Sequence, residues 1–192
     1  MARPPSDKRS RILDAAIHCF GERSFPEVKL DLIAERAGVA KWTIYLYFTS
    51  KEALFCECLL PSQDWFEQAS RIIEGRGSIH DRLLALIELQ NDIYTQKGPL
   101  IQQMLQFESS LSFSPQIMSR VQSHLRHVVM LNSRLFQEGI DSGVFADRLT
   151  AEQMAVIFIQ IFDLRVKFEA LRVKPLENHD IFNALLRLFG NP

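Results

Sequence analysis

Hydrogen-bond donors and flat aromatic rings are concentrated in one short stretch of the sequence. Lys41, Trp42, Thr43, Tyr45 and Tyr47 lie within seven residues, at positions that we expect to point outward from a short helix. An ammonium group, hydroxyl groups and rings at this spacing suit phosphates and the edges of base pairs. The stretch therefore predicts contact with double-stranded DNA. A structural helical hairpin is the alternative, but it does not require these side chains to be exposed together.

Other reactive side chains do not form a recognisable catalytic or metal site. His124 and His127 are three residues apart on one helix face, but no third ligand is evident. Cys56 and Cys58 are two residues apart in a helix and point to different sides. The sequence contains no P-loop and no G-x-S-x-G motif. We therefore expect no enzyme, no metal and no cofactor, and redox sensing by a thiol stays open because it depends on pKa and exposure.

Charge is unevenly distributed along the 192 residues. The net charge of −1 does not by itself indicate a nucleic-acid partner. The segment up to Lys51, however, contains nine basic and six acidic residues, so its net charge is +3. The rest of the chain has a net charge of −4. This asymmetry indicates a basic DNA-binding part followed by an acidic body.

The sequence also predicts a cytoplasmic protein without a membrane segment. The first residues lack the apolar core of a signal peptide. The longest apolar run, about Met154 to Leu164, is too short to span a bilayer. Three cysteines without a secretory signal indicate reduced thiols.

Apolar residues recur every three or four positions in nearly every segment between helix breakers. This period is typical of amphipathic helices, so we expect an all-α protein with about nine helices. Pro61 breaks one helix, and Gly98-Pro99 is expected to open a new one. The predicted helical segments are 6–22, 30–37, 40–47, 51–60 (resuming to 73 after a break or kink at Pro61), 78–96, 98–108, 115–138, 151–173 and 178–189.

Two of these short helices flank Gly38, a residue suited to a left-handed helix cap. Ile33, Ala37, Val39 and Ile44 can form an apolar seam between them. This is the pattern of a helix-turn-helix, whose second helix enters the DNA major groove.

Residues 8–56 resemble the TetR family of tetracycline-repressor-like transcription regulators. That family has a three-helix DNA-binding head, a connecting fourth helix and a larger helical domain that binds an effector and dimerises. The resemblance thus implies a helix-turn-helix domain over 1–50 and an effector-binding and dimerisation domain over 51–192. It rests on Arg11-Ile-Leu-Asp-Ala-Ala16, Phe20-Gly-Glu-Arg23, Ile33-Ala34, Ala37-Gly-Val39, Lys41, Thr43-Ile-Tyr45, Tyr47-Phe48 and Ser50-Lys-Glu-Ala-Leu-Phe55.

The resemblance also implies roles for individual side chains. Lys41, Trp42 and Tyr45 would face the major groove, while Thr43 and Tyr47 would contact phosphates. Lys51 would reach a phosphate at the N-terminus of the fourth helix.

Three positions depart from the family pattern. Trp42 stands where the family usually has glycine, so its usual base preference does not transfer. Ala40 stands where serine or threonine is usual. Val28 replaces a threonine that can cap the second helix, and we expect the neighbouring Lys29 to supply the phosphate contact instead.

The C-terminal helices are apolar on more than one side, which favours burial against a second copy of the chain. A core within one chain is the alternative. The expected interface residues are Phe158, Ile161, Phe168, Phe182, Leu185 and Phe189.

An effector pocket is the least defined prediction, because aromatic residues at helical spacing are more often core. Asp163 in an apolar stretch needs a partner, which is either a ligand or Lys167. The candidate lining residues are Trp65, Phe66, Asn91, Met104, Phe107, Gln160 and Asp163.

Together these patterns predict a homodimeric repressor that a small molecule releases from a near-palindromic operator. The alternatives are an activator, or a DNA-binding protein without an effector. A helical enzyme or protein-interaction module is a further alternative, and it predicts no salt-dependent DNA binding.

Overall fold

The computed structural model describes residues 5–107 and 114–191. The all-α prediction is confirmed, and within those ranges the only β pairing is one isolated bridge between Phe145 and Gly190. The helices of the described ranges are α1 (Pro5–Glu22), α2 (Leu30–Ala37), α3 (Lys41–Tyr47), α4 (Lys51–Leu59), α5 (Gln63–Ile73), α6 (Ile79–Phe107), α7 (Pro115–Asp141), α8 (Ala151–Ala170) and α9 (Asn178–Phe189). None of the described helices is long and apolar enough to cross a membrane.

Several predicted helix starts are confirmed by their hydrogen bonds. Ser114 accepts the Ile117 backbone N–H at 3.4 Å, one residue before Pro115 begins α7. Thr150 and Gln153 bond reciprocally, because each side chain accepts the other's backbone N–H, at 3.2 and 2.9 Å. Each pair satisfies backbone donors that have no partner within the helix.

The prediction that Gly98-Pro99 opens a new helix is wrong. Helix α6 continues through Pro99, although an interior proline removes a hydrogen bond and costs about 3 kcal/mol. Two neighbouring side chains hold this segment in place. Leu100 is buried, and the Lys97 ammonium donates to the Leu60 carbonyl at 2.6 Å. Tertiary contacts therefore outweigh the local preference of proline.

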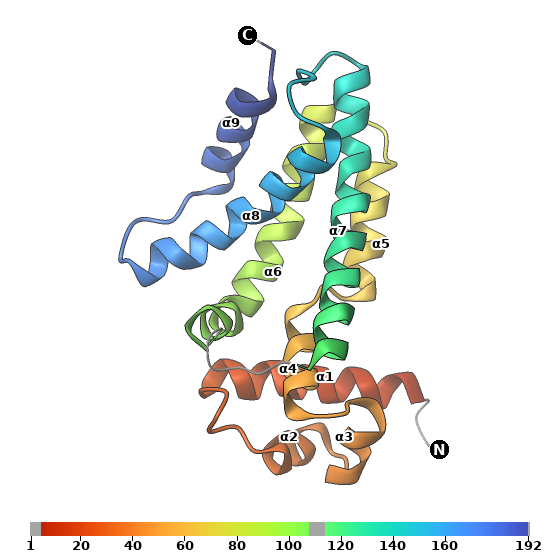
Figure 1. The fold of residues 1–192 in the computed structure, drawn as a ribbon, viewed down its shortest axis with the longest axis vertical. Helices are drawn as coiled ribbons and strands as arrows, with labels where there is room; N and C mark the ends of the chain where they lie inside the picture. The colour runs from red at the N-terminus through yellow and green to blue at the C-terminus, as the bar shows by residue number, and fades with distance from the viewer. Residues whose placement is uncertain (1–4, 108–113, 192) are drawn as a thin grey trace. The chain divides into compact units, whose positions relative to one another are not determined.

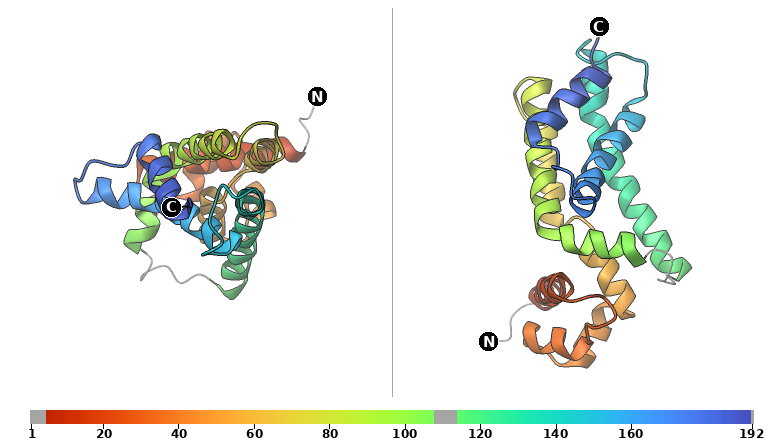
Figure 2. Two further views of the ribbon diagram at one scale, coloured as in Figure 1. Left: turned by 90° about the horizontal axis from the view of Figure 1, so that it is seen from above. Right: turned by 90° about the vertical axis from the view of Figure 1, so that its left-hand side faces the viewer.

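The chain divides into two compact units, and unit 1 comprises residues 1–60 and 97–121. Helices α1, α2, α3 and α4 surround a core in which the rings of Phe20, Phe25 and Phe55 lie 5.0–5.8 Å apart. Figure 2 (right) views α1, in red, nearly along its axis, with α2 and α3 beside each other. This core fixes the helix-turn-helix on a rigid base.

The extent of unit 1 differs from the predicted division at residue 50. Helix α4 contributes Phe55 to its core, and the end of α6 contributes a cap for α1. The Gln103 side-chain amide donates to the carbonyls of Phe20 and Arg23, at 2.5 and 3.1 Å. Residues distant in sequence thus satisfy the last carbonyls of α1, which sequence periodicity does not reveal.

Unit 2 comprises residues 61–96 and 122–192. In Figure 1, α5, α7 and the first part of α6 run lengthwise, and α8 and α9 lie beside each other. An aromatic cluster fills the interior, with the Phe136 ring 5.5–5.8 Å from those of Phe145, Phe158 and Phe189. At one end Arg82 donates to both carboxylate oxygens of Glu138.

Gly139 in α7 has no room for a side chain. A Cβ atom there would collide with the ring of Phe145, which is itself buried. We expect Gly139→Ala to lower the free energy of unfolding by about 1–3 kcal/mol, measured by urea denaturation. Gly21→Ala is the matched control, because its Cβ would meet only Leu100 at 3.8 Å. Equal stability of the two variants would contradict the expected clash.

Candidate DNA-binding interface

The turn between α2 and α3 has the predicted left-handed cap. Gly38 adopts φ 63°, and the Val39 N–H donates to the Ala34 carbonyl at 2.9 Å. The Arg11 guanidinium adds hydrogen bonds to the carbonyls of Ala37 and Gly38. A basic residue of α1 thereby satisfies the C-terminal carbonyls of α2 and fixes the angle at which α3 begins.

Helix α3 presents one face to solvent. Trp42, Tyr45 and Leu46 are 66%, 52% and 68% exposed, and Lys41 is also exposed. The prediction that Thr43 points outward is wrong, since it is 6% exposed and turns inward beside buried Ile44. Leu46 was missed by sequence reasoning, although its spacing of four residues from Trp42 places both on one face.

Four of the predicted DNA-binding residues line one open groove of about 520 Å³. They are Lys29, Lys41, Tyr45 and Lys51, which come from the start of α2, from α3 and from the start of α4. Ser50 caps α4 as predicted, by accepting the Ala53 N–H at 3.1 Å. The three ammonium groups outnumber the carboxylates of Asp31 and Glu52 in this groove, and two helix N-termini beside it also favour phosphate.

Two of these lysines have partners inside unit 1. Lys41 Nζ lies 2.8 Å from Asp31 Oδ2, and this hydrogen bond raises the pKa of Lys41 and lowers that of Asp31. Lys51 Nζ lies 4.4 Å from the centre of the Phe25 ring, and burial lowers its pKa. The positive charges of the groove are therefore held in place by neighbours.

The remaining predicted residues take other positions. Val28 is 1% exposed and belongs to the core of unit 1, and Lys29 precedes α2 without a side-chain cap. Apolar packing therefore explains why valine stands here in place of a residue that caps. Tyr47 is half-buried and lines a different cavity.

Comparison with known proteins agrees with this geometry. Residues 12–58 match the family described as bacterial regulatory proteins, tetR family. Residues 12–58 are therefore similar to the DNA-binding domain of the TetR family, and the chain is a DNA-binding transcriptional regulator.

Relatives that match about three quarters of this chain are also regulators. The regulator RutR of Escherichia coli K12 is 29% identical over 149 residues, which are 76% of this chain and 68% of RutR. The fatty acid metabolism regulator protein of Bacillus subtilis is 25% identical over 145 residues, 74% of this chain and 73% of that protein. The crystal structure of FadR from Bacillus subtilis in complex with stearoyl-CoA has a TM-score of 0.71 at 23% identity and covers 94% of this chain and 96% of that one. The last likeness establishes the shared fold.

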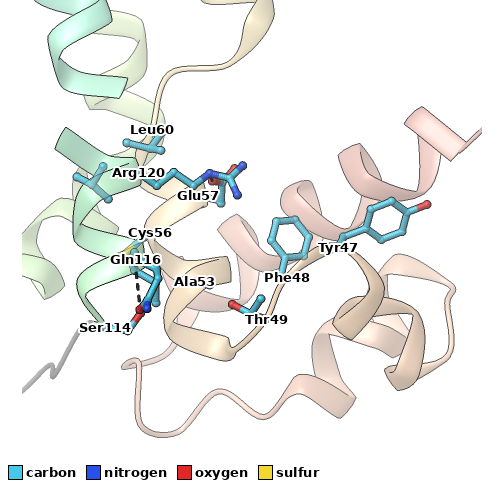
Figure 3. A pocket seen from close by; sticks show the side chains of 12 residues that line it. Tyr47, Phe48, Thr49, Ala53, Cys56, Glu57, Leu60, Ser114, Gln116 and Arg120 are labelled. Atoms are coloured by element: carbon cyan, nitrogen blue, oxygen red, sulfur yellow. Dashed lines mark hydrogen bonds and ion pairs between the residues drawn. The ribbon is translucent and has the colours of Figure 1, made fainter. Parts of the chain in front are cut away.

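A second cavity lies within unit 1, between the end of α3, α4 and the start of α7. It measures about 190 Å³. Glu57 and Arg120 point toward each other beside it (Figure 3), with Arg120 Nε 2.7 Å from Glu57 Oε1. Arg9 Nη2 lies 2.5 Å from Glu57 Oε2. The Glu57 carboxylate thus joins α1, α4 and α7.

The three cysteines of the chain are free and buried. Burial raises the pKa of the Cys56 thiol from 9.0 to about 11 and also raises that of Cys58. At about pH 8 we expect iodoacetamide to alkylate native Cys56 about 100-fold more slowly than an ordinary thiol, since only the thiolate reacts. Mass spectrometry measures the labelling, and the urea-unfolded chain is the control in which all three thiols react. Rapid native labelling would contradict this and favour thiol redox sensing.

The predicted effector residues have varied surroundings. Trp65 and Phe66 belong to the core of unit 2, Asn91 is half-buried and Gln160 is exposed. The side chains of Met104, Phe107 and Asp163 lie outside the described residues. Their convergence on one pocket stays a prediction.

His124 and His127, the pair for which the sequence offers no third metal ligand, lie on α7 next to Phe66. The ring of His127 stacks on that phenylalanine at 4.5 Å, and the His124 ring lies 5.1 Å from it. In the described part of the chain, no three His, Cys, Asp or Glu side chains are grouped as a metal site requires.

Half of the predicted dimer-interface residues lie elsewhere than expected. Phe158, Leu185 and Phe189 are at most 1% exposed in the single chain, so placing them at a partner is wrong. They form the core of unit 2 because α9 buries its apolar stripe against the same bundle. Ile161, Phe168 and Phe182 are only partly buried and remain candidates.

Proposed function

We propose that this chain is a dimeric cytoplasmic repressor, released from a near-palindromic operator by a small-molecule effector. The observation that carries the proposal is the groove in which Lys29, Lys41, Tyr45 and Lys51 meet beside the exposed face of α3. One head of this size makes few base contacts, so useful specificity requires two heads on two half-sites.

Exposed apolar side chains on α8 and α9 support a dimer. Val156 and Leu164 of α8 and Leu188 of α9 are 41–50% exposed in the single chain. The half-buried Ile161 and Phe182 lie on the same two helices and extend this apolar surface. A two-fold bundle of α8, α9 and their copies would remove this surface from water, as symmetric interfaces do.

We infer that the effector binds in unit 2 and has both apolar and polar parts. Trp65 Nε1, Gln90 Oε1 and Asn132 Oδ1 are buried without a hydrogen-bond partner among the described residues. They come from α5, α6 and α7, in an otherwise apolar interior. A buried polar atom without a partner costs about 1–3 kcal/mol, which a ligand that bonds to it would recover.

Acyl-CoA thioesters are the first effector class to test. The similar FadR structure was solved with stearoyl-CoA, and a long acyl chain suits an apolar bundle interior. Coupling of about 1–3 kcal/mol between effector and operator would weaken DNA binding about 5- to 150-fold. Helix α4 is suited to transmit this coupling, because its Glu57 forms ion pairs with Arg9 and Arg120. Pro61 follows the end of the helix.

Selection of bound duplexes from a random DNA library tests the repressor proposal. We expect a near-palindromic site, and we expect Lys41→Ala and Tyr45→Ala to lose it. Stearoyl-CoA, with free CoA as its control, is then added to the selected complex and release is followed by fluorescence polarisation. Retained binding by both variants would refute the DNA interface, whereas release by neither molecule would refute only the effector class.

A further inference from the structure

The exposed face of the recognition helix α3 is largely apolar. Trp42 and Leu46 are each about two-thirds exposed, and Tyr45 between them is half exposed. The other large side chain of that face is Lys41. An exposed apolar face on a binding helix indicates that the bound partner presents apolar groups to that face.

The composition of α3 restricts how it can read bases. Of its seven residues, Lys-Trp-Thr-Ile-Tyr-Leu-Tyr, only Lys41 can pair with guanine, and none is the arginine, asparagine or glutamine that pairs with two atoms of guanine or adenine. They also lack a carboxylate, which accepts from cytosine N4. One further feature distinguishes base pairs in the major groove. The C5 methyl group of thymine is apolar and accessible there, and apolar side chains contact it.

We infer that Leu46 and Trp42 read thymine methyl groups in each half-site, and this rests on the proposed DNA interface. The two side chains are four residues apart and share one helix face, so they meet methyl groups of neighbouring base pairs along the groove. Lys41 lies at the N-terminal end of the same helix, in the groove that it lines with Lys29 and Lys51. Its contact sets the register of α3 along the base pairs. Apart from the contact of Lys41, the specificity of α3 then comes from apolar contact and not from paired hydrogen bonds.

Deoxyuridine tests this inference, because it pairs like thymidine but lacks the methyl group. In the duplex selected from the random library, each thymine is replaced in turn, in both half-sites. Burial of one methyl group contributes about 0.8 kcal/mol, so each contacted thymine should give about fourfold weaker binding per half-site. In Leu46→Ala or Trp42→Ala, the same replacement should have no further effect at the position that the removed side chain contacts.

Leu125→Ala is the matched control, since Leu125 is a 47% exposed leucine on α7. It should keep the full response to deoxyuridine. Equal affinity for thymine and deoxyuridine at every position would overturn the inference and leave the DNA interface standing. Failure of the wild-type chain to select any duplex would instead refute the DNA interface itself.

Discussion

Replacing Phe136 with alanine is expected to lower the free energy of unfolding of unit 2 by about 3–5 kcal/mol. Phe136 is fully buried, and its ring contacts those of Phe145, Phe158 and Phe189. Three helices and the segment that follows α7 meet at this ring, so its removal leaves a cavity that no single neighbour can fill. A loss of this size is a large part of the 5–15 kcal/mol that stabilises a typical domain.

Urea denaturation followed by tryptophan fluorescence measures this loss. The chain has two tryptophans, and a Trp42→Phe background leaves Trp65, which is buried in unit 2, as the reporter. Phe182→Ala is the matched control, because that phenylalanine is only partly buried. If both alanine variants lose the same stability, Phe136 is not the centre of the core.

Much of the fold follows from local sequence signals. Residues 30–37 and 178–189 form helices with the predicted limits, because each segment contains its own apolar stripe and a glycine follows it directly. Gly38 determines the turn for the same local reason, since glycine adopts a positive φ without steric cost. Signals contained in ten or twelve residues can be read without knowing the fold.

The errors arise where distant segments decide the outcome. Pro99 remains helical because Lys97 and Leu100 contact other parts of unit 1. Similarly, an apolar stripe such as that of α9 does not reveal whether its own chain or a second copy covers it. The structure assigns Leu185 and Phe189 to the core of unit 2.

In the candidate site, too, contacts with distant segments decide which side chains of α3 are exposed. Spacing alone identified Lys41, Trp42 and Tyr45, but the rotation of α3 about its axis is fixed by Ile44 and Phe48 against the core of unit 1. That rotation buries Thr43 and exposes Leu46. The partner of Lys41 was also beyond sequence reasoning, because Asp31 is ten residues away on another helix.

Replacing Lys41 with alanine is expected to weaken operator binding about 30-fold or more. A good base contact contributes about 1–3 kcal/mol, and the proposed dimer loses it in both heads. The same substitution leaves the carboxylate of Asp31 without its partner on the proposed DNA-binding surface, where it would repel phosphates. Part of the loss should therefore come from Asp31, and Asp31→Asn in the Lys41→Ala background should recover it.

Asp31→Asn alone separates two roles of that carboxylate. If Asp31 competes with DNA for the Lys41 ammonium, the variant binds more tightly, and its affinity falls more steeply with salt because one more charged contact to DNA forms per head. Polarisation titrations over a salt series measure both quantities. Lys174→Ala is the matched control, since its ammonium pairs with Glu177 at 3.0 Å on the surface of unit 2. Weaker binding by Asp31→Asn would contradict competition. It would mean instead that the carboxylate aims Lys41 at its base, so that the ion pair of the free protein is already the geometry that reads DNA.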